Sequence, residues 1–284
     1  MVVIYEGSVS LTLEINPFGY KDIVNMKIIF LGTGTSEGVP IIMQPDSIEI
    51  DLDNPKNWRT RTSIHVVMNG HHIQVDAGPD FRMQCINNKI CKIDTFILTH
   101  GHSDHIVGMD DLRRYCRLNN GEAIPVYSNS EGLNRVRDIF PYAIRDRAEG
   151  NYPAFKLKDM PKCLKVPGGT IYSTNLPHGK LSVLGLVFEE DISGKKFTYY
   201  TDCKQVPCSA IELANGSDLV VLDALRHRPQ FTHMNILEAT EVAREIGGKE
   251  TWFVHMCCEV DHERDSKCLP KSVAFAWDGL SFEI

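Results

Sequence analysis

The segment Thr99-His100-Gly101-His102-Ser103-Asp104-His105 constrains this chain more than any other. It places three imidazoles and a carboxylate in six consecutive positions, directly after the apolar run 95–98. Imidazole nitrogen and carboxylate oxygen are ligands that Zn²⁺ and similar divalent metals accept. A turn after a strand lets alternate side chains converge on one point while Asp104 and His105 face a second point. The segment therefore predicts a metal site with room for two ions; the alternative is a surface loop that happens to be rich in histidine.

Four more metal-compatible residues stand at the carboxyl ends of apolar runs, in the order Asp76, His178, Asp202 and His255. Taken singly, such a residue is more often a cap or a hydrogen-bonded structural side chain. With all of them in this order, the chain resembles the metallo-β-lactamase fold superfamily, whose signature is His-x-His-x-Asp-His. The resemblance implies an α/β (α+β) fold, a four-layer αββα sandwich with the metal site at one edge of the two sheets.

The resemblance also implies the roles of these residues. One divalent ion, Zn²⁺ or Mn²⁺, would be held by His100, His102 and His178. A second ion would be held by Asp104, His105 and His255, and Asp202 would bridge the two ions. Water activated by the two metals would be the nucleophile, since metal binding lowers its pKa to about 7. Asp76 is expected behind the ligands, where it accepts a hydrogen bond from a ligand imidazole.

Both ends of this region resemble the branch that contains the cyclic phosphodiesterase of phosphonate breakdown. The opening, MKIIFLGTGTSEGVP at 26–40, has the glycine loop of that branch, and AWDGLSFEI at 276–284 has its terminal Asp-Gly strand. His233, in Thr-His-Met-Asn, falls where the branch has an additional active-site histidine. We therefore take His233 and Asp104 as candidate catalytic residues. A helix-cap histidine is the rival interpretation of His233.

The sequence departs from that branch at two places. Ile-Ile-Met-Gln-Pro-Asp follows the opening, where the phosphonate enzyme has cysteines for a structural zinc, so that zinc site is expected to be absent. Cys258 stands where relatives often have a histidine three residues after the last ligand. The role of that histidine is therefore not carried over to this chain.

Composition and charge narrow the class of protein. The 284 residues are 43% hydrophobic and 24% charged, which is ordinary for a globular enzyme. No apolar run approaches the roughly 18 residues of a membrane span, and the amino terminus lacks a signal-like core, so we expect a cytoplasmic protein with no membrane partner. The nine cysteines are scattered without a Cys-x-x-Cys pair, which favours reduced thiols.

The net charge of −7 argues against a general nucleic-acid partner, which usually presents a basic face. Three basic residues near the motifs, Arg61, Lys180 and Arg226, are weak candidates for binding a substrate phosphate. The alternative for each is an ordinary surface ion pair. A homodimer is left open, because no apolar surface stripe in the sequence identifies an interface.

No repeat or flexible linker divides the chain, so 26–284 is predicted to form one domain. Residues 1–25 form an extension of uncertain status, with alternating segments at 2–5 and 9–15 that resemble strands. The remaining patterns predict two hairpins, 62–76 and 182–201. Four helices are predicted at 106–119, 130–140, 207–214 and 234–247, and buried strands at 94–98, 218–223 and 251–254.

These observations favour a dinuclear metallo-hydrolase that acts on a small or cyclic phosphodiester. A tRNA 3′-processing endoribonuclease shares the metal motifs and a similar opening, but the acidic balance and the lack of a basic arm argue against it. A thioester or lactone hydrolase is a further alternative, because the same metals can activate water against a carbonyl. A non-catalytic scaffold is disfavoured, since every ligand position holds a competent residue.

Overall fold

Two seven-stranded sheets form the centre of the molecule. The computed structural model describes residues 26–45 and 47–284, so the predicted extension 1–25 lies outside the described residues. The strands of the first sheet, in spatial order, are β14 (Ser281–Glu283), β1 (Met26–Gly32), β2 (Ser63–Met68), β3 (His71–Val75), β4 (Thr95–Ile97), β5 (Ile124–Ser128) and β6 (Phe155–Asp159). Those of the second are β13 (Val273–Phe275), β12 (Glu250–Val254), β11 (Leu219–Asp223), β10 (Lys196–Tyr200), β9 (Leu181–Glu190), β8 (Gly169–His178) and β7 (Cys163–Val166).

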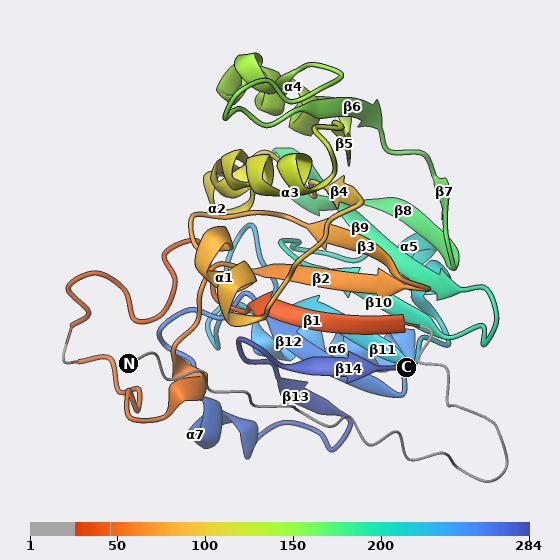
Figure 1. Cartoon of the computed structure of the whole chain (residues 1–284). Helices are drawn as coiled ribbons and strands as arrows, with labels where there is room; N and C mark the ends of the chain where they lie inside the picture. The colour runs from red at the N-terminus through yellow and green to blue at the C-terminus, as the bar shows by residue number, and fades with distance from the viewer. Residues whose placement is uncertain (1–25, 46) are drawn as a thin grey trace, which may run out of the picture.

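Helices cover the outer face of each sheet, as Figure 1 shows. On the first sheet they are α1 (Phe81–Asn87), α2 (Ser103–Ile106), α3 (Arg113–Leu118) and α4 (Ser130–Ile139). On the second they are α5 (Cys208–Ala214), α6 (Ile236–Ile246) and α7 (His262–Ser266). Short 3₁₀ turns complete the described chain at η1 (Pro55–Asn57), η2 (Val107–Leu112) and η3 (Pro141–Ala143). The layers are therefore helix, sheet, sheet and helix, and the predicted fold class is confirmed.

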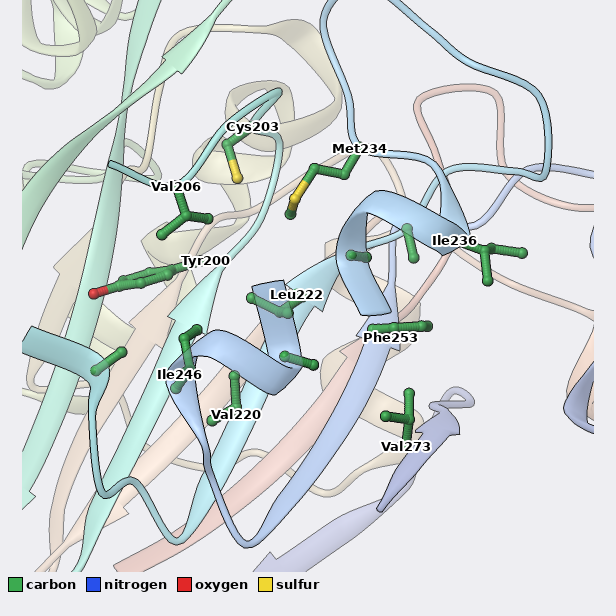
Figure 2. Packing of buried hydrophobic residues seen from close by; sticks show 14 of the residues in the cluster. Tyr200, Cys203, Val206, Val220, Leu222, Met234, Ile236, Ile246, Phe253 and Val273 are labelled. Atoms are coloured by element: carbon green, nitrogen blue, oxygen red, sulfur yellow. The ribbon is translucent and has the colours of Figure 1, made fainter. Parts of the chain in front are cut away.

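Three buried apolar clusters hold these layers together. One lies between the sheets and includes Ile64, Phe188 and Val221. The others lie between each sheet and its helices. Figure 2 shows the cluster over the second sheet, where Leu222 and Phe253 point toward the helix that carries Ile246. Burying each such side chain contributes about 1.5–3 kcal/mol, so the helices are fixed by packing more than by their own propensity.

Strand direction explains where functional residues gather. Strands β3, β4, β5 and β6 are parallel neighbours in the first sheet, and β10, β11, β12 and β13 are parallel neighbours in the second. The carboxyl ends of parallel neighbours meet at one edge of a sheet, and ligands of open α/β sheets collect there. The residues after β3, β4, β10, β11 and β12 therefore converge on one region.

Most predicted elements are confirmed. The first hairpin turns at Asn69 and Gly70, both with positive φ, as the Asn-Gly signal requires. The second hairpin is β9 and β10, and the strands predicted at 94–98, 218–223 and 251–254 are β4, β11 and β12. The helices predicted at 130–140, 207–214 and 234–247 are α4, α5 and α6, within two residues at each end.

The single helix predicted over 106–119 is wrong. This segment consists of the end of α2, the 3₁₀ turn η2 and α3. Gly108 explains the interruption, because its N–H donates to the carbonyl of Ala77, 2.8 Å away, and not to a carbonyl one turn earlier. A Cβ at this position would lie 2.1 Å from the carbonyl oxygen of Gly78. The loop after β3 therefore packs directly on the metal-motif segment and breaks the regular helix.

Candidate metal centre

The ring nitrogens of His100, His102 and His178 form the first group of candidate ligands. His100 and His102 follow β4, and His178 ends β8. The Nδ1 atom of His102 lies 2.9 Å from His100 Nε2 and 3.3 Å from His178 Nε2. Two nitrogens that bind one tetrahedral Zn²⁺ at about 2.0–2.1 Å lie about 3.3 Å apart. The three atoms therefore have the spacing of ligands to one ion.

Asp104, His105, Asp202 and His255 form the second group, and all four are buried. Asp202 Oδ2 lies 3.2 Å from His105 Nε2 and 3.1 Å from His255 Nε2, while Asp104 Oδ2 lies 3.2 Å from His105 Nε2. The same Asp202 oxygen is 3.9 Å from His100 Nε2 of the first group. Asp202 thus stands between the groups, where one carboxylate can face two ions.

A left-handed backbone conformation orients two of these ligands and Asp76, which lies behind them. Asp76, Asp202 and His255 follow β3, β10 and β12, and each has a left-handed φ, of 61°, 53° and 61°. The left-handed region is sparsely populated by residues other than glycine and costs roughly 1–2 kcal/mol per residue. Outliers of this kind cluster at functional sites. Here each one turns a side chain out of its strand and toward the shared edge.

Hydrogen bonds behind the ligands set the ring tautomers. His105 Nδ1 donates to Asp76 Oδ2 at 2.7 Å, and His178 Nδ1 donates to the carbonyl of Thr232 at 2.9 Å. Thr99 Oγ1 donates to Asp76 at 2.7 Å, so this hydroxyl oxygen accepts the Nδ1 proton of His100, 3.1 Å away. In each case the Nδ1 proton is engaged and the Nε2 lone pair faces the cluster, which is the arrangement metal-binding histidines use.

The residues present fit a metal. His105 Nε2 and His255 Nε2 are buried and face the Asp104 and Asp202 carboxylates, but among the described residues no well-directed hydrogen bond satisfies them. An orphaned buried nitrogen costs free energy unless something satisfies it, and a cation between these atoms would do so. The cluster therefore can bind metal ions.

The charges agree with this conclusion. Burial opposes ionisation of Asp202, yet the neighbouring His255 and His105 hold its pKa well below the usual range. Burial, together with the nearby His105, keeps the pKa of His100 well below 6.5, so its imidazole stays neutral as a ligand must be. His105 behaves in the opposite way when no metal is bound. Burial lowers its pKa, but Asp202, Asp104 and Asp76 outweigh burial and raise the pKa well above 6.5. The second group thus attracts positive charge.

His233 lies against both groups. Its ring stacks on His255, with centroids 4.7 Å apart, and packs edge-on against His178 at 4.7 Å. Its Nδ1 donates to Asp223 Oδ2 at 2.8 Å. His233 precedes Asn235, the residue that caps α6 through a capping box, so a cap role for His233 itself is wrong.

Asp223 was not predicted as a site residue. It ends β11, is fully buried, and its Oδ1 lies 4.0 Å from His255 Nδ1. It therefore stands behind both His233 and His255. The signal was present in the sequence, since Asp223 ends the apolar run Leu-Val-Val-Leu-Asp in the same way that Asp202 ends its own strand.

The basic candidates lie outside both ligand groups. Arg61 is bound to Asp80, with Nη1 3.1 Å from Oδ2, and Arg226 lies 3.7 Å from Glu259. Both match the ion-pair alternative that the sequence left open. Lys180 is exposed just after the His178 turn, and nothing in the described chain pairs with its amine.

Cysteines near the ligands belong to the core. Cys203 is fully buried, and its backbone N–H donates to Asp223 Oδ2 at 3.0 Å. Burial raises the pKa of its thiol well above the usual value. Figure 2 shows it beside Met234, in the cluster under α6. Cys258, at the position of the missing histidine, is also buried. All nine thiols are free.

Comparisons with known proteins agree with this geometry. The model of the β-lactamase superfamily domain matches residues 71–256, more than half of the chain. A crystal structure described as a new diphosphatase from the PhnP family is 30% identical, with a TM-score of 0.82, and the match covers 91% of this chain and 97% of that one. The structure of Zn²⁺-bound PqqB from Methylobacterium extorquens is 19% identical with a TM-score of 0.71, covers 91% of this chain and 100% of that one, and shows the fold alone.

Two curated relatives carry different names. An octanoyltransferase of Porphyromonas gingivalis is 31% identical over 262 residues, which are 90% of this chain, but the chain spans only about half (51%) of that protein. A ribonuclease Z of Agathobacter rectalis is 24% identical over 261 residues, 71% of this chain and 82% of the relative. The matched domain and the likeness to the diphosphatase give a consistent assignment: the chain belongs to the metallo-β-lactamase superfamily, in the branch of the PhnP family.

Proposed function

We propose that this hydrolase cleaves a small phosphodiester or a diphosphate ester with two divalent ions, Zn²⁺ or Mn²⁺. The observation that carries the proposal is the pair of ligand groups that meet at Asp202, with His233 packed against both. The likeness to a PhnP-family diphosphatase over almost all of that chain supports phosphorus, rather than carbon, as the centre attacked.

Each residue has a role in this proposal. The first group would hold one ion, the second group the other, and Asp202 would face both. Bound ions would lower the pKa of a water and withdraw charge from the phosphoryl oxygens. Asp76 keeps the Nδ1 proton of His105 in place, and Thr232 does the same for His178. Asp104, as a ligand of the second group, would position the nucleophile that this group activates.

His233 would give a proton to the leaving oxygen. Its Nδ1 proton is engaged by Asp223, and a ring nitrogen of His233 lies within 4.8 Å of ligand atoms of His178 and Asp202. The Asp223 carboxylate orients the ring and stabilises the charged imidazole, as the buried carboxylate does in catalytic triads. Hydrolysis then adds water across one P–O bond, with OH on phosphorus and the proton on the departing oxygen.

Acyl-thioester hydrolysis is the second candidate. The relative named octanoyltransferase, 31% identical over 90% of this chain, is the observation that favours it. Since the chain spans about half of that protein, the name gives a substrate class to test and no more. The relatives named ribonuclease Z make tRNA processing a third candidate function. The net charge of −7 argues against it.

The test is turnover by metal-stripped protein to which Mn²⁺ or Zn²⁺ is returned. The panel contains a cyclic phosphodiester, a diphosphate diester, a 3′-extended tRNA, an octanoyl thioester and a lactone. His102→Ala should lower kcat/KM by at least about 10³-fold, because one ion loses a ligand. The His102 side chain is exposed, so the fold should survive. His227→Ala, a change at another exposed histidine, is the control and should leave turnover unchanged. Turnover of the thioester alone would refute the proposal.

Three broader expectations are also proposals: a cytoplasmic setting, a homodimer, and the absence of a general nucleic-acid partner. Among the described residues, no helix is long and apolar enough to cross a bilayer. The nine free thiols support a reducing, cytoplasmic setting. Sedimentation would test the homodimer, and filter binding would test the absence of a nucleic-acid partner.

A further inference from the structure

A pocket with several polar and charged residues in its lining lies beside the first ligand group. It has a volume of ≈ 330 Å³ and is lined by residues 100–102 of the metal loop, the segment 99–105 that carries the His-x-His-x-Asp-His motif, together with one face of α4 and the start of β9. Its lining includes His100, His102, Glu131, Arg135, Asp138 and Ser182. Because two proposed ligands form one wall, a substrate bound on the metals would extend into this pocket.

Arg135 is the cation of the pocket, and the metal loop holds its stem. A Cβ placed on Gly101 would lie 2.9 Å from both Cβ and Cγ of Arg135, so these two carbons rest on the backbone between His100 and His102. A glycine is needed at 101 for this close approach. The stem of Arg135 therefore packs on the backbone that carries His100 and His102, and its exposed side chain lines the pocket beside them.

The Arg135 guanidinium is unpaired in the described part of the chain. Across 26–45 and 47–284 it makes no hydrogen bond and no ion pair, although Glu131 and Asp138 lie one turn away on the same helix. Of the phosphate ligands that the sequence suggested, Arg61 and Arg226 are engaged by Asp80 and Glu259, and Lys180 is unpaired but does not line this pocket. Arg135 is thus a free, fork-shaped donor beside the metal groups, and such forks match phosphate bidentately.

The pocket is rigid on the side that carries Arg135. Asn129 caps α4 by accepting from the Gly132 N–H at 2.8 Å, and its amide nitrogen donates to the carbonyl of Ser182 at 2.8 Å. Ser128 Oγ donates to the carbonyl of Leu98, two residues before His100. The start of α4 is therefore tied to β9 and to the end of the strand that leads into His100, which fixes the backbone of α4 relative to the ligands.

We propose that Arg135 binds a second phosphate of the substrate, next to the one attacked at the metals. This inference rests on the proposed function and narrows it to esters that contain a diphosphate. Glu131 and Asp138 on the same wall disfavour further negative charge. A neutral, hydroxyl-bearing group beyond the second phosphate, such as a sugar, would suit this wall, because its hydroxyls can donate to these carboxylates.

The test compares two substrates and three variants. UDP-glucose carries the second phosphate, and bis(p-nitrophenyl) phosphate does not. Arg135→Met keeps the apolar stem on Gly101 and removes the guanidinium, Arg135→Lys keeps the charge without the fork, and Arg117→Met on α3 is the matched control. Metal content and the thermal midpoint are measured for each, so that a disturbed metal loop is recognised.

Arg135→Met should lower kcat/KM on UDP-glucose by about 10- to 100-fold, the loss of one charge-assisted contact, mainly through KM. The value on bis(p-nitrophenyl) phosphate should not change, Arg135→Lys should be intermediate, and Arg117→Met should match the parent on both. An equal loss on both substrates would mean that Arg135 acts on the attacked phosphate, and no loss on either would leave it without a role. Both outcomes overturn the proposal.

Binding separates this inference from the proposed function. If metal-loaded protein hydrolyses neither substrate, the proposed function fails, but calorimetry with inorganic pyrophosphate and phosphate still tests Arg135. Arg135→Met should weaken pyrophosphate binding by about 10-fold and leave phosphate binding unchanged. Equal pyrophosphate affinity in parent and variant would refute the second-phosphate site on its own.

Discussion

Asp76→Asn is the change whose consequence can be worked furthest. Asp76 is fully buried and accepts three hydrogen bonds: from the Thr99 N–H at 2.8 Å, from Thr99 Oγ1 at 2.7 Å and from His105 Nδ1 at 2.7 Å. An asparagine amide has one oxygen. If that oxygen keeps the Thr99 N–H, the NH₂ group faces His105 Nδ1, and two donors meet. His105 must then carry its proton on Nε2, the atom that points at Asp104 and Asp202.

The expected magnitude follows from what is lost. A hydrogen bond to a charged acceptor contributes about 1.5–3 kcal/mol, which corresponds to roughly 10- to 150-fold in a dissociation constant. The loss of affinity should be largest for the ion held by the second group, because His105 belongs to that group. The first group is connected to Asp76 only through Thr99, so its ion should be weakened less.

The assay is metal affinity by competition with a chelating indicator, together with metal content and turnover. The variant should hold one ion tightly and one weakly. Asp94→Asn, at a carboxylate before β4 that bonds the backbone of His72, is the control and should bind as the parent does. Thr99→Val keeps the His105 contact and should cost less than Asp76→Asn. Two ions bound with parental affinity by folded Asp76→Asn would refute the tautomer argument.

Three further changes have separate readouts. Burial lowers the pKa of His65 to about 4, against 6.5 in the unfolded chain, so the unfolded chain takes up the proton first as pH falls. The free energy of unfolding should therefore drop by up to about 3 kcal/mol between pH 6.5 and 4. In urea titrations, His65→Gln should lack this part of the pH dependence. Gly78→Ala places a Cβ 2.1 Å from the carbonyl oxygen of Asp104. It should lower the free energy of unfolding by about 1–3 kcal/mol and weaken metal binding. An unchanged midpoint of thermal unfolding would contradict the close packing. His233→Gln should lower kcat about 10²- to 10⁴-fold on alkyl esters. The loss should be far smaller on p-nitrophenyl esters, because their leaving group needs no proton. Equal losses on both kinds of ester would argue against a role of His233 as general acid.

The sequence could predict the candidate ligands because each depends on local information. His100, His102 and His105 belong to one turn, and Asp202 and His255 each end an apolar strand. Strand ends converge only if the strands are parallel neighbours, and the sheet order supplies this. Asp223 also ends an apolar strand. It was not predicted because it is not a metal ligand but the residue that orients His233.

Arg135 could not be found from the sequence. Its position depends on contacts between segments far apart in the chain, Asn129 with the start of β9 and the Arg135 stem with Gly101. The interrupted helix after α2 has the same kind of cause. Its Gly108 N–H donates to the carbonyl of Ala77, in the loop after β3, instead of to a carbonyl of its own helix. Helix α1 has no side-chain cap and is seven residues long, so it gave little signal.

The centre stores unfavourable terms that a cation would offset. Asp76, Asp202 and His255 hold left-handed backbones, at roughly 1–2 kcal/mol each. Asp104 and Asp202 bring two carboxylates into a buried space, and the Nε2 atoms of His105 and His255 lie 3.2 and 3.1 Å from Asp202 without a well-directed hydrogen bond. Divalent ions would neutralise the carboxylates and satisfy the nitrogens together, without any change of backbone. The strain is therefore the consequence of a site built for its ligands in advance, and metal binding should add directly to the stability of the edge where the two sheets meet.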